Sequence, residues 1–328
     1  MRVVLLRPDR IGDCVIGSCA VGDLRRALPE ADLLWVVRNA NAGLFSGADF
    51  PAGLCAYDEA DGVDALATRL KAWRADVAVL LSPDASADRA VLAAGIPVRL
   101  GFRSEIPGAL TATPGCDKQD GLKHEADYAR DLLRSIPGVH IPAMLPLRPV
   151  VRPAEDGRWR EMLASAARNR GLLVVHPGAH AGKSVVPEAV WMEAALRLAG
   201  RTGLIPVVIG AASATRLVRE DVCDLRGRLS LEGTAGLLAE ATLCLSRDSG
   251  PAHLAAAVGC PTVCVFLENT PKMGPVRWTP LGDAVRTLVP PPPRGYEKAF
   301  FELYRRRAVR SVTADAIIDA ASALLASR

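Results

Sequence analysis

Short apolar runs rich in β-branched residues recur along this chain, separated by segments of helix length. RVVLL, DLLWVV and DVAVLL lie in the first part, and LLVVH, IPVVIG, TLCLS and TVCVF lie in the second. Strands that alternate with helices at this spacing form parallel sheets built from βαβ units. The spacing therefore predicts an α/β fold.

The chain of 328 residues is long enough for about two domains. Between the two sets of runs lies HIPAMLPLRPVVRP, residues 140–153, whose prolines prevent a regular helix and favour an extended linker. We therefore expect two similar α/β domains that flank a cleft, residues 1–150 and 151–328. The last segment, TADAIIDAASALLAS, predicts a terminal helix with Thr313 at its N-cap.

Composition excludes several classes of protein. A net charge of +4 and an aromatic content of 5% do not indicate a nucleic-acid partner. The longest apolar stretch, from Ala255, is interrupted by Gly259 and Pro261 and is shorter than the roughly 18 residues of a spanning helix. The first residues lack a signal-peptide pattern, so we expect a cytoplasmic protein. The 8 cysteines include no CxxC pair, which favours reduced thiols and predicts neither a metal site nor a disulfide.

The first informative loop is RPDRIGDCVIG, which follows the first predicted strand and opens a helix. Asp13 at the helix start is either an N-cap or a general base. For a base, Gly12 leaves space for a substrate, and Arg7 and Arg10 supply positive charge. The loop has no GxGxxG pattern, which argues against a dinucleotide-dependent dehydrogenase.

The second loop, HPGAHAGKSVVPEAVW, follows the run LLVV. Gly178 allows the backbone to turn, and Lys183 can reach a phosphate as a point charge. A single loop lysine is more often solvated, and His176 is equally well explained as a hydrogen-bonded core histidine. This loop alone therefore leaves both interpretations open.

The third loop, RDSGPAHLAAAVGCPTV, gives the strongest signal. Asp248, Ser249 and Gly250 follow a predicted strand, and Pro251 suits the first turn of a helix. Such a turn presents backbone N–H groups at a helix N-terminus, which is a site for an anion such as a diphosphate. The alternative is an ordinary tight turn in which Ser249 caps the helix and His253 packs on it.

In combination and order, four segments resemble glycosyltransferase family 9, the family of ADP-heptose:lipopolysaccharide heptosyltransferases. They are RPDRIGD with LRRALPEADLLWVV, HPGA with Lys183, LRGRLSLEGTAGLLAEATLCLSRDSGPAHLAAAVGCPTVCVF, and RWTPLG. The resemblance implies a GT-B fold, in which two Rossmann-like domains with parallel sheets face a central cleft. It further implies that residues 1–150 bind the acceptor, that residues 151–328 bind the nucleotide-sugar, and that the last helix packs back on the first domain.

The resemblance also assigns roles to residues. Asp13 matches the catalytic base, which deprotonates the acceptor hydroxyl for attack on the anomeric carbon with inversion. Lys183 matches a phosphate-contacting lysine, and Asp248 matches a carboxylate near the donor sugar. The segment that cradles the donor phosphates contains Ser249, Gly250, Pro251 and His253. A DxD triplet is absent, which suits transfer without a metal ion.

One departure from the family concerns recognition of the donor base. The family has a Glu soon after an IGG-like strand end, whereas IGAASATRLVRE offers Thr215 and Arg216 before Glu220. Either the contact comes from backbone groups around Leu229, or the donor is not an ADP-sugar.

For the acceptor, the resemblance points to Arg10, Gly12 and His124. The segment that contains His124, KHEADYARDLL, is equally well explained as an amphipathic helix.

The leading hypothesis is an inverting, metal-independent glycosyltransferase. It moves a heptose or related sugar from a nucleotide-sugar to a saccharide or lipid-linked acceptor, and ADP-heptose is the preferred candidate for the donor. The nucleotide-sugar is a co-substrate, and no other cofactor is expected. A basic cluster suggests peripheral association with the inner face of a membrane: Arg305, Arg306, Arg307 and Arg310. The alternatives are a GT-B-type nucleotide-sugar epimerase and a non-catalytic module that binds nucleotide or carbohydrate.

Overall fold

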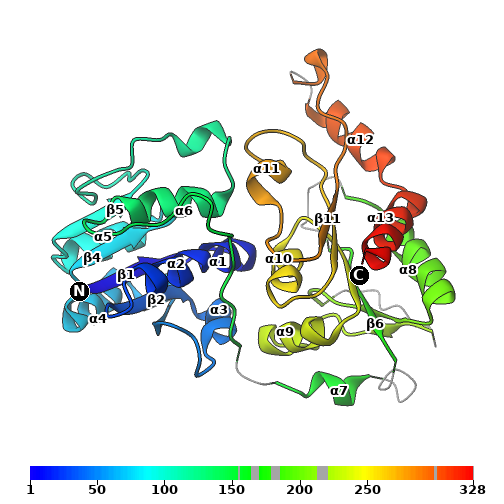
Figure 1. Ribbon diagram of the computed structural model, residues 1–328, viewed down its shortest axis with the longest axis horizontal. Coiled ribbons are helices and arrows are strands. Elements are labelled where there is room, and N and C mark those ends of the chain that lie inside the picture. The colour runs from blue at the N-terminus through cyan, green and yellow to red at the C-terminus, as the bar shows by residue number, and fades with distance from the viewer. Residues whose placement is uncertain (154–155, 164–169, 179–184, 213–220, 299–300, 328) are drawn as a thin grey trace. The chain divides into compact units, whose positions relative to one another are not determined.

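The computed structural model describes residues 1–153, 156–163, 170–178, 185–212, 221–298 and 301–327 (Figure 1). It divides into two compact units, Met1–Ala154 and Glu155–Arg328. The boundary predicted from the sequence follows residue 150, and the division between the units falls four residues later. Each unit contains one parallel sheet, so the predicted α/β class is confirmed.

The first unit contains a five-stranded parallel sheet in the order β3-β2-β1-β4-β5. Its strands are β1 Arg2–Leu6, β2 Asp32–Arg38, β3 Gly53–Tyr57, β4 Val77–Leu80 and β5 Val98–Gly101. From β1 the chain proceeds through β2 to β3 at one edge, and then through β4 to β5 at the other. The strand order therefore reverses between β1 and β4, where loops diverge and ligands bind in folds of this class.

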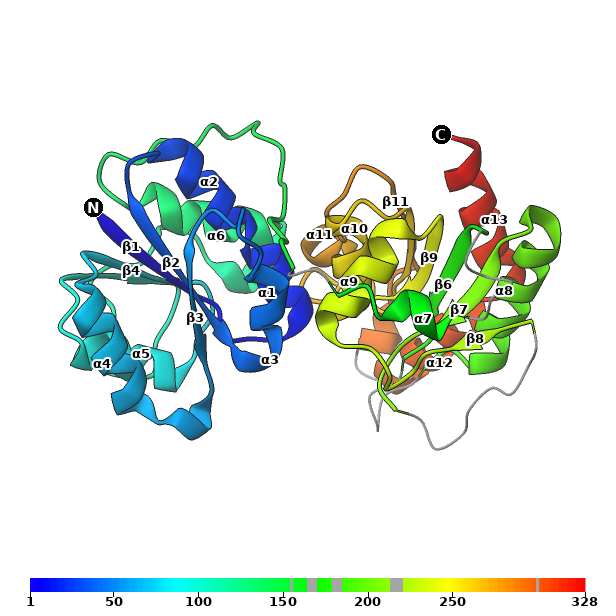
Figure 2. The same ribbon diagram turned by 90° about the horizontal axis from the view of Figure 1, so that it is seen from below.

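Helices cover both faces of this sheet, as Figure 2 shows. They are α1 Ile11–Gly17, α2 Cys19–Ala27, α3 Asn39–Ala42, α4 Val63–Trp73, α5 Ala85–Ala93 and α6 Glu125–Arg134, with 3-10 turns η1 Gly43–Phe45, η2 Glu59–Asp61 and η3 Lys118–Asp120. Val4 and Leu6 of β1 share a core with Leu66 of α4 and Val91 of α5. Because the sheet is buried on both faces, its central strands are apolar except for exposed charged residues at the ends of β1 and β2.

The second unit contains a six-stranded parallel sheet in the order β11-β10-β9-β6-β7-β8. Its strands are β6 Leu172–His176, β7 Ile205–Val208, β8 Cys223–Asp224, β9 Leu243–Arg247, β10 Thr262–Val265 and β11 Val285–Leu288. From β6 the chain proceeds through β7 to β8, and from β9 through β10 to β11 in the opposite direction. The switch point of this sheet therefore lies between β6 and β9.

The second unit also contains helices, several of which pack on its sheet. They are α7 Trp159–Met162, α8 Glu188–Thr202, α9 Leu231–Glu240, α10 Gly250–Ala257, α11 Pro275–Trp278, α12 Phe301–Ser311 and α13 Ala314–Ala326, with the turn η5 Gly295–Lys298. One core lies between the sheet and helices α8 and α13, and α10 packs on β9 and β10. Among the described residues, no helix is long and apolar enough to cross a membrane.

The last helix packs in the core of its own unit, and its expected packing on the first domain stays a prediction. Helix α13 packs within the second unit, against α8 and strands β9 to β11. Its apolar residues Ile317, Ile318 and Ala321 are buried in the core that contains Trp191 of α8. The predicted cap of this helix is confirmed, because the Thr313 hydroxyl accepts a hydrogen bond from the N–H of Ala316 at 3.2 Å.

Candidate active site

Arg7 directly follows β1 at the switch point of the first sheet. Its side chain is buried, with 3% of its surface exposed. The guanidinium Nη1 donates a hydrogen bond of 2.7 Å to the carbonyl oxygen of Leu81, which directly follows β4. Arg7 therefore bridges the two strands at which the direction of the sheet reverses.

Asp13 is the third residue of α1, and its carboxylate points to Arg7 rather than capping the helix. The N-cap of α1 is Arg10, which makes no capping hydrogen bond with its side chain. Arg7 Nη2 donates to Asp13 Oδ1 at 2.9 Å. Oδ2 accepts no hydrogen bond from any residue that the structure describes, and the side chain is 21% exposed. The N-cap interpretation of Asp13 is therefore wrong, whereas an ionisable oxygen is left available.

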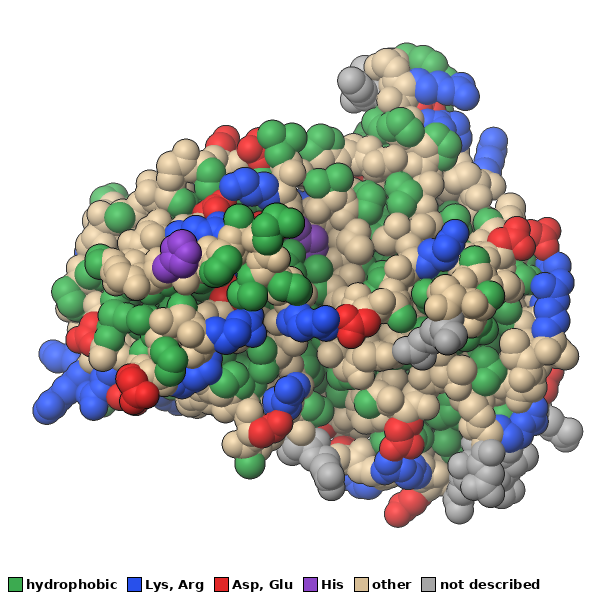
Figure 3. All heavy atoms as spheres, viewed as in Figure 1, with side chains coloured by type: hydrophobic (Ala, Val, Ile, Leu, Met, Phe, Trp, Pro, Cys, Tyr) green, Lys and Arg blue, Asp and Glu red, His purple; other side chains and the backbone are tan. Residues whose placement is uncertain are grey.

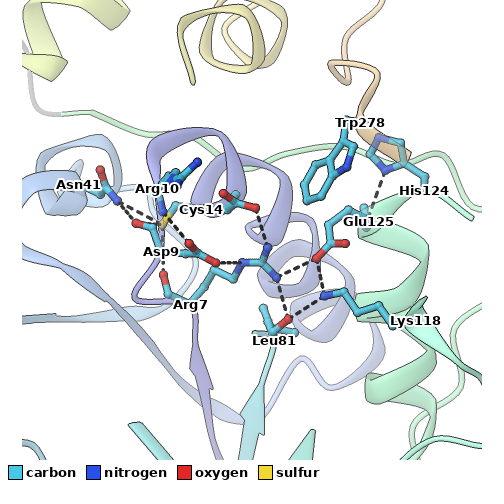
Figure 4. Close-up of polar contacts among 12 residues, drawn as sticks. Arg7, Asp9, Arg10, Cys14, Asn41, Leu81, Lys118, His124, Glu125 and Trp278 are labelled. Atoms are coloured by element: carbon cyan, nitrogen blue, oxygen red, sulfur yellow. Dashed lines mark hydrogen bonds and ion pairs between the residues drawn. The ribbon is translucent and has the colours of Figure 1, made fainter. Parts of the chain in front are cut away.

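Two further carboxylates share the Arg7 guanidinium (Figure 4). Glu125 Oε1, from the first turn of α6, lies 3.0 Å from Nη1, and Asp9 Oδ2 lies 3.6 Å from Nε. Lys118 of η3 forms an ion pair with the same Glu125 oxygen, and its ammonium also donates to the Leu81 carbonyl at 3.1 Å. Sequence reasoning missed Glu125 and Lys118, although Glu125 lies within the segment that contains His124.

The charges around Asp13 act on its pKa in opposite directions. Burial raises the pKa of Asp13, the positive charge of Arg7 lowers it, and Asp9 raises it, with a net shift above the ordinary value of 3.8. For Arg7, burial lowers the pKa, but the facing carboxylates Glu125, Asp13 and Asp9 raise it more. A cation is therefore fixed beside a carboxylate that binds a proton more readily than an exposed Asp.

The residues predicted for the acceptor lie around the same loop. Gly12 is buried in α1, and Arg10 is exposed, with its backbone N–H donating to Asp9 Oδ1 at 3.0 Å. His124 is the N-cap of α6, where its Nδ1 accepts a hydrogen bond from the N–H of Ala126 at 3.2 Å. Capping by a histidine was not predicted, and it gives His124 a structural role in this segment.

In the second sheet, His176 ends β6 and lies at the switch point beside β9. Its Nδ1 lies 3.1 Å from the Ser249 hydroxyl and 3.3 Å from the Ser246 hydroxyl, and the ring is buried. A Cβ at Gly178 would lie 2.3 Å from the ring Cε1, so only glycine fits against this ring. His176 is thus a hydrogen-bonded buried histidine that orients Ser249, in agreement with the core interpretation.

The N-terminus of α10 presents free backbone donors at this switch point. Ser249 is the N-cap by position, but its hydroxyl makes no capping hydrogen bond and instead donates to the Arg247 carbonyl at 3.0 Å. In the described part of the chain, the N–H groups of Ser249 and Gly250 donate to no acceptor, and Pro251 has no N–H. These donors and the positive end of the helix dipole suit an anion.

The side chains next to this helix end are charged or polar. Asp248 Oδ1 lies 3.5 Å from Nε2 of His253, which is buried on α10. Arg247 donates to the carbonyl oxygen of Gly178 at 3.0 Å, and burial lowers its pKa. Leu229, whose neighbouring backbone groups are one candidate contact for the donor base, is half-buried in the loop before α9.

Lys183 lies outside the described residues, and so do Thr215, Arg216 and Glu220, which mark the departure from the family pattern. Within the ranges that the structure describes, no group of three or more His, Cys, Asp or Glu side chains is arranged to hold a metal ion.

Solved structures similar to this chain show the same fold. The ADP-heptose lipopolysaccharide heptosyltransferase II of E. coli is 20% identical, with a TM-score of 0.78 over 100% of this chain and 99% of that one. A glycosyl transferase family 9 protein of Veillonella parvula is 17% identical, with a TM-score of 0.80 over 100% of this chain and 98% of that one. The GT-B fold class that the resemblance implied is confirmed.

Sequence comparisons identify the family. Lipopolysaccharide heptosyltransferase 1 of Pseudomonas aeruginosa is 26% identical over 300 residues, which cover 83% of this chain and 80% of that protein. The model of glycosyltransferase family 9 (heptosyltransferase) matches residues 63–292, more than half of the chain. The chain is therefore a glycosyltransferase, and it belongs to glycosyltransferase family 9, the heptosyltransferase family.

Proposed function

We propose that this glycosyltransferase moves a heptose from ADP-heptose to a saccharide or lipid-linked acceptor of lipopolysaccharide, with inversion at the anomeric carbon and without a metal ion. The names of the similar E. coli and P. aeruginosa proteins support this donor and this acceptor class. The structural observation that carries the proposal is the pair of N–H groups at the start of α10 that no described residue accepts from, at the switch point of the second sheet.

The proposed donor site is the loop and first turn of α10. The N–H groups of Ser249 and Gly250 bind the diphosphate, and the helix dipole stabilises the negative charge that develops on the leaving ADP. Asp248 and His253 lie beside the heptose, and Lys183 adds a cation. Pro251 keeps the first turn in helical geometry and leaves the N–H groups of Ser249 and Gly250 available to the diphosphate. Backbone groups around Leu229 contact the adenosine.

The proposed base is Asp13. Its free Oδ2 takes the proton of an acceptor hydroxyl, whose oxygen forms a bond to the anomeric carbon of the donor. The bond from this carbon to the diphosphate oxygen breaks, and its electron pair leaves with ADP. Arg10, Gly12 and His124 are the proposed acceptor contacts. Attack from the side opposite ADP inverts the anomeric configuration.

A nucleotide panel tests the donor without any acceptor. We expect ADP to raise the melting temperature of the protein more than UDP, GDP or dTDP at the same concentration. A ligand at about 100 times its dissociation constant stabilises the folded state by about 2.7 kcal/mol. A preference for another nucleotide would replace the donor, and no response to any of the four would contradict the proposed donor site.

The Asp13→Asn variant tests the base. We expect turnover with ADP-heptose and acceptor to fall by roughly 10²- to 10⁴-fold, because a general base contributes about this factor. Stabilisation by ADP should be unchanged. Asp64→Asn is a matched control, since Asp64 is an exposed acid in the first turn of α4. Turnover of Asp13→Asn at the control rate would exclude the base, and loss of turnover in EDTA would exclude metal independence.

For the membrane, we propose peripheral association through α12, which projects from the rest of the second unit (Figure 1). Arg305 pairs with Glu268 at 2.9 Å and Arg307 with Glu297 at 2.7 Å. Arg306 and Arg310 of α12 are exposed and form no ion pair with any described residue. Blue side chains lie along this projecting part in Figure 3. Two unpaired cations suit an anionic lipid surface.

Sedimentation with phosphatidylglycerol vesicles tests this association. We expect salt-sensitive binding that weakens when Arg306 and Arg310 are both replaced by Ala. Arg201 and Arg286, exposed elsewhere on the second unit, make a control pair with the same loss of charge. Equal binding of the two double variants would assign any association to net charge, and the α12 surface would be dismissed.

A further inference from the structure

Five ionisable side chains gather at the carboxyl edge of the first sheet, and three of them are more than nine-tenths buried. The five are Arg7, Asp9, Asp13, Lys118 and Glu125. The buried ones are Arg7 at 3%, Lys118 at 9% and Glu125 at 2% exposure. Burying charges costs desolvation free energy, and well-packed apolar residues are often as stabilising as a buried ion pair. Stability alone therefore does not account for Glu125 and Lys118.

The geometry of the cluster connects Glu125 to Asp13 through one rigid group. Glu125 Oε1 receives Arg7 Nη1 at 3.0 Å and the Lys118 ammonium, and both cations also donate to the Leu81 carbonyl. The opposite nitrogen of the guanidinium, Nη2, reaches Asp13 Oδ1 at 2.9 Å. Because the guanidinium is a planar fork, fixing Nη1 also fixes the direction of Nη2.

The charge balance of the cluster favours proton uptake by Asp13. With all five groups ionised, two cations face three carboxylates, and the sum is −1. When Asp13 takes a proton, the sum is zero. The groups that face Asp13 are Arg7 and Asp9 after β1 and Glu125 at the start of α6, with Lys118 of η3 behind Glu125 and the His124 ring engaged as the cap of α6.

We propose that Glu125 and Lys118 are a pair of positioning residues: through Arg7 they hold the Asp13 carboxylate in place and set how readily it accepts the acceptor proton. This inference rests on the proposed role of Asp13 as the base. Neither residue touches substrate in this scheme. Glu125 contributes the negative charge that promotes proton uptake, and Lys118 limits that effect by neutralising part of it.

Deleting a negative and a positive charge in two separate variants tests the pair. The readout is the acidic limb of the profile of kcat/KM against pH, whose position reports the pKa of the base in the free enzyme. Glu125→Gln removes a negative charge, so the limb should move to lower pH by about 0.5–1 unit. Lys118→Met removes a positive charge, so the limb should move to higher pH by a similar amount. On the limb itself, each shift changes kcat/KM by roughly 3- to 10-fold. The double variant should return close to the wild-type limb.

Control variants separate positioning from a purely structural role. Glu105→Gln deletes an exposed carboxylate paired with Arg103 at 3.0 Å, and it should leave the limb in place. Glu125→Asp keeps the charge, so its limb should stay near wild type even where kcat falls, and this variant serves if Glu125→Gln does not fold. A purely structural role would lower the melting temperature of Glu125→Gln and Lys118→Met without moving their limbs in opposite directions, and that result overturns the inference. Equal shifts of the limb in Glu125→Asp and Glu125→Gln also overturn it.

The failure of this inference differs from the failure of the proposed function. If Asp13→Asn keeps full turnover, the base itself is wrong. If Asp13→Asn loses turnover but the limb is the same in Glu125→Gln, Lys118→Met and wild type, the base stands and the positioning pair is wrong.

Discussion

At the scale of single residues, opposing effects of burial and of neighbouring charges set the pKa of the Asp13 carboxylate. Arg7 attracts its ionised form at 2.9 Å, while burial and the neighbouring carboxylates favour the protonated form. The second set of effects prevails, because the pKa of Asp13 is raised. Ionised Asp13 therefore reduces the stability of the fold at neutral pH, and this cost is consistent with a group retained for chemistry.

The pH dependence of stability checks the sign of this effect. Between 3.8, the ordinary pKa of Asp, and the raised pKa of Asp13, the folded protein holds a proton that the unfolded chain has lost. The free energy of unfolding therefore falls as pH rises through this window. The Asp13→Asn variant does not titrate here, so we expect its urea midpoint, relative to wild type, to increase from pH 4 upward and to level off above the raised pKa. A relative midpoint that decreases with pH would mean that Arg7 prevails and the pKa is lowered.

At the scale of elements, the central strands of both sheets are predictable and the edge strands are not. The apolar runs predicted β1, β2 and β4 in the first sheet and β6, β7, β9 and β10 in the second. The strands without a predicted run are β3, β5, β8 and β11, which are the four edges. Edge strands are covered less completely, as the half-buried residues of β11 show. Their sequences therefore lack the continuous apolar character of strands buried on both faces.

Some residues of the candidate site are predictable from the sequence next to them, and others are brought to the site only by tertiary contacts. Asp13 and the segment around Ser249 lie in loops that follow predicted strands, so the strand predictions were enough to identify them as candidates. Glu125 meets Arg7 across 118 residues of chain, and no local pattern links the two. Lys118 belongs to a short 3-10 turn with no periodicity of its own. Contacts that depend on tertiary packing could not be derived from the order of residues alone.

Two helix N-caps of the second unit provide a prediction at the element scale. The Thr313 hydroxyl caps α13, whereas the Ser249 hydroxyl points to His176 and does not cap α10. We expect Thr313→Ala to lower the free energy of unfolding by about 1 kcal/mol, the usual loss for a working cap. Ser249→Ala should lower it less but should weaken stabilisation by ADP, because the loop loses its contact with His176.

Urea unfolding with and without ADP measures both effects. Thr313→Ala serves as the control for ADP binding, since its loss of stability should leave the ADP-induced shift unchanged. A larger loss of nucleotide-free stability in Ser249→Ala than in Thr313→Ala would show that the Ser249 hydroxyl acts as a structural group of the turn rather than as part of a donor site.

At the scale of the whole molecule, each unit carries its own core and its own switch point. Trp35 of β2 is fully buried in the first unit, and Trp191 of α8 is fully buried in the core of the second. Polar groups at the two switch points differ in chemistry: Arg7 shares its guanidinium among carboxylates, whereas the backbone N–H of Gly250 has no acceptor among the described residues. The first set of groups suits proton transfer and the second suits phosphate binding, which is the basis for proposing that the base lies in the first unit and the donor site in the second.

Hydrogen exchange measured by mass spectrometry checks this division. Because the proposed donor site is built from the second unit, bound ADP must dissociate before that unit unfolds, while the first unit can open with ADP still in place. At about 100 times the dissociation constant, linkage slows exchange through unfolding by roughly 100-fold. We expect this slowing in buried peptides of residues 155–328, such as β6 and β9, and not in β1 or β4. UDP at the same concentration is the control. Slowing confined to residues 1–154 would place the nucleotide on the wrong unit, and equal slowing throughout would mean that the two units unfold as one.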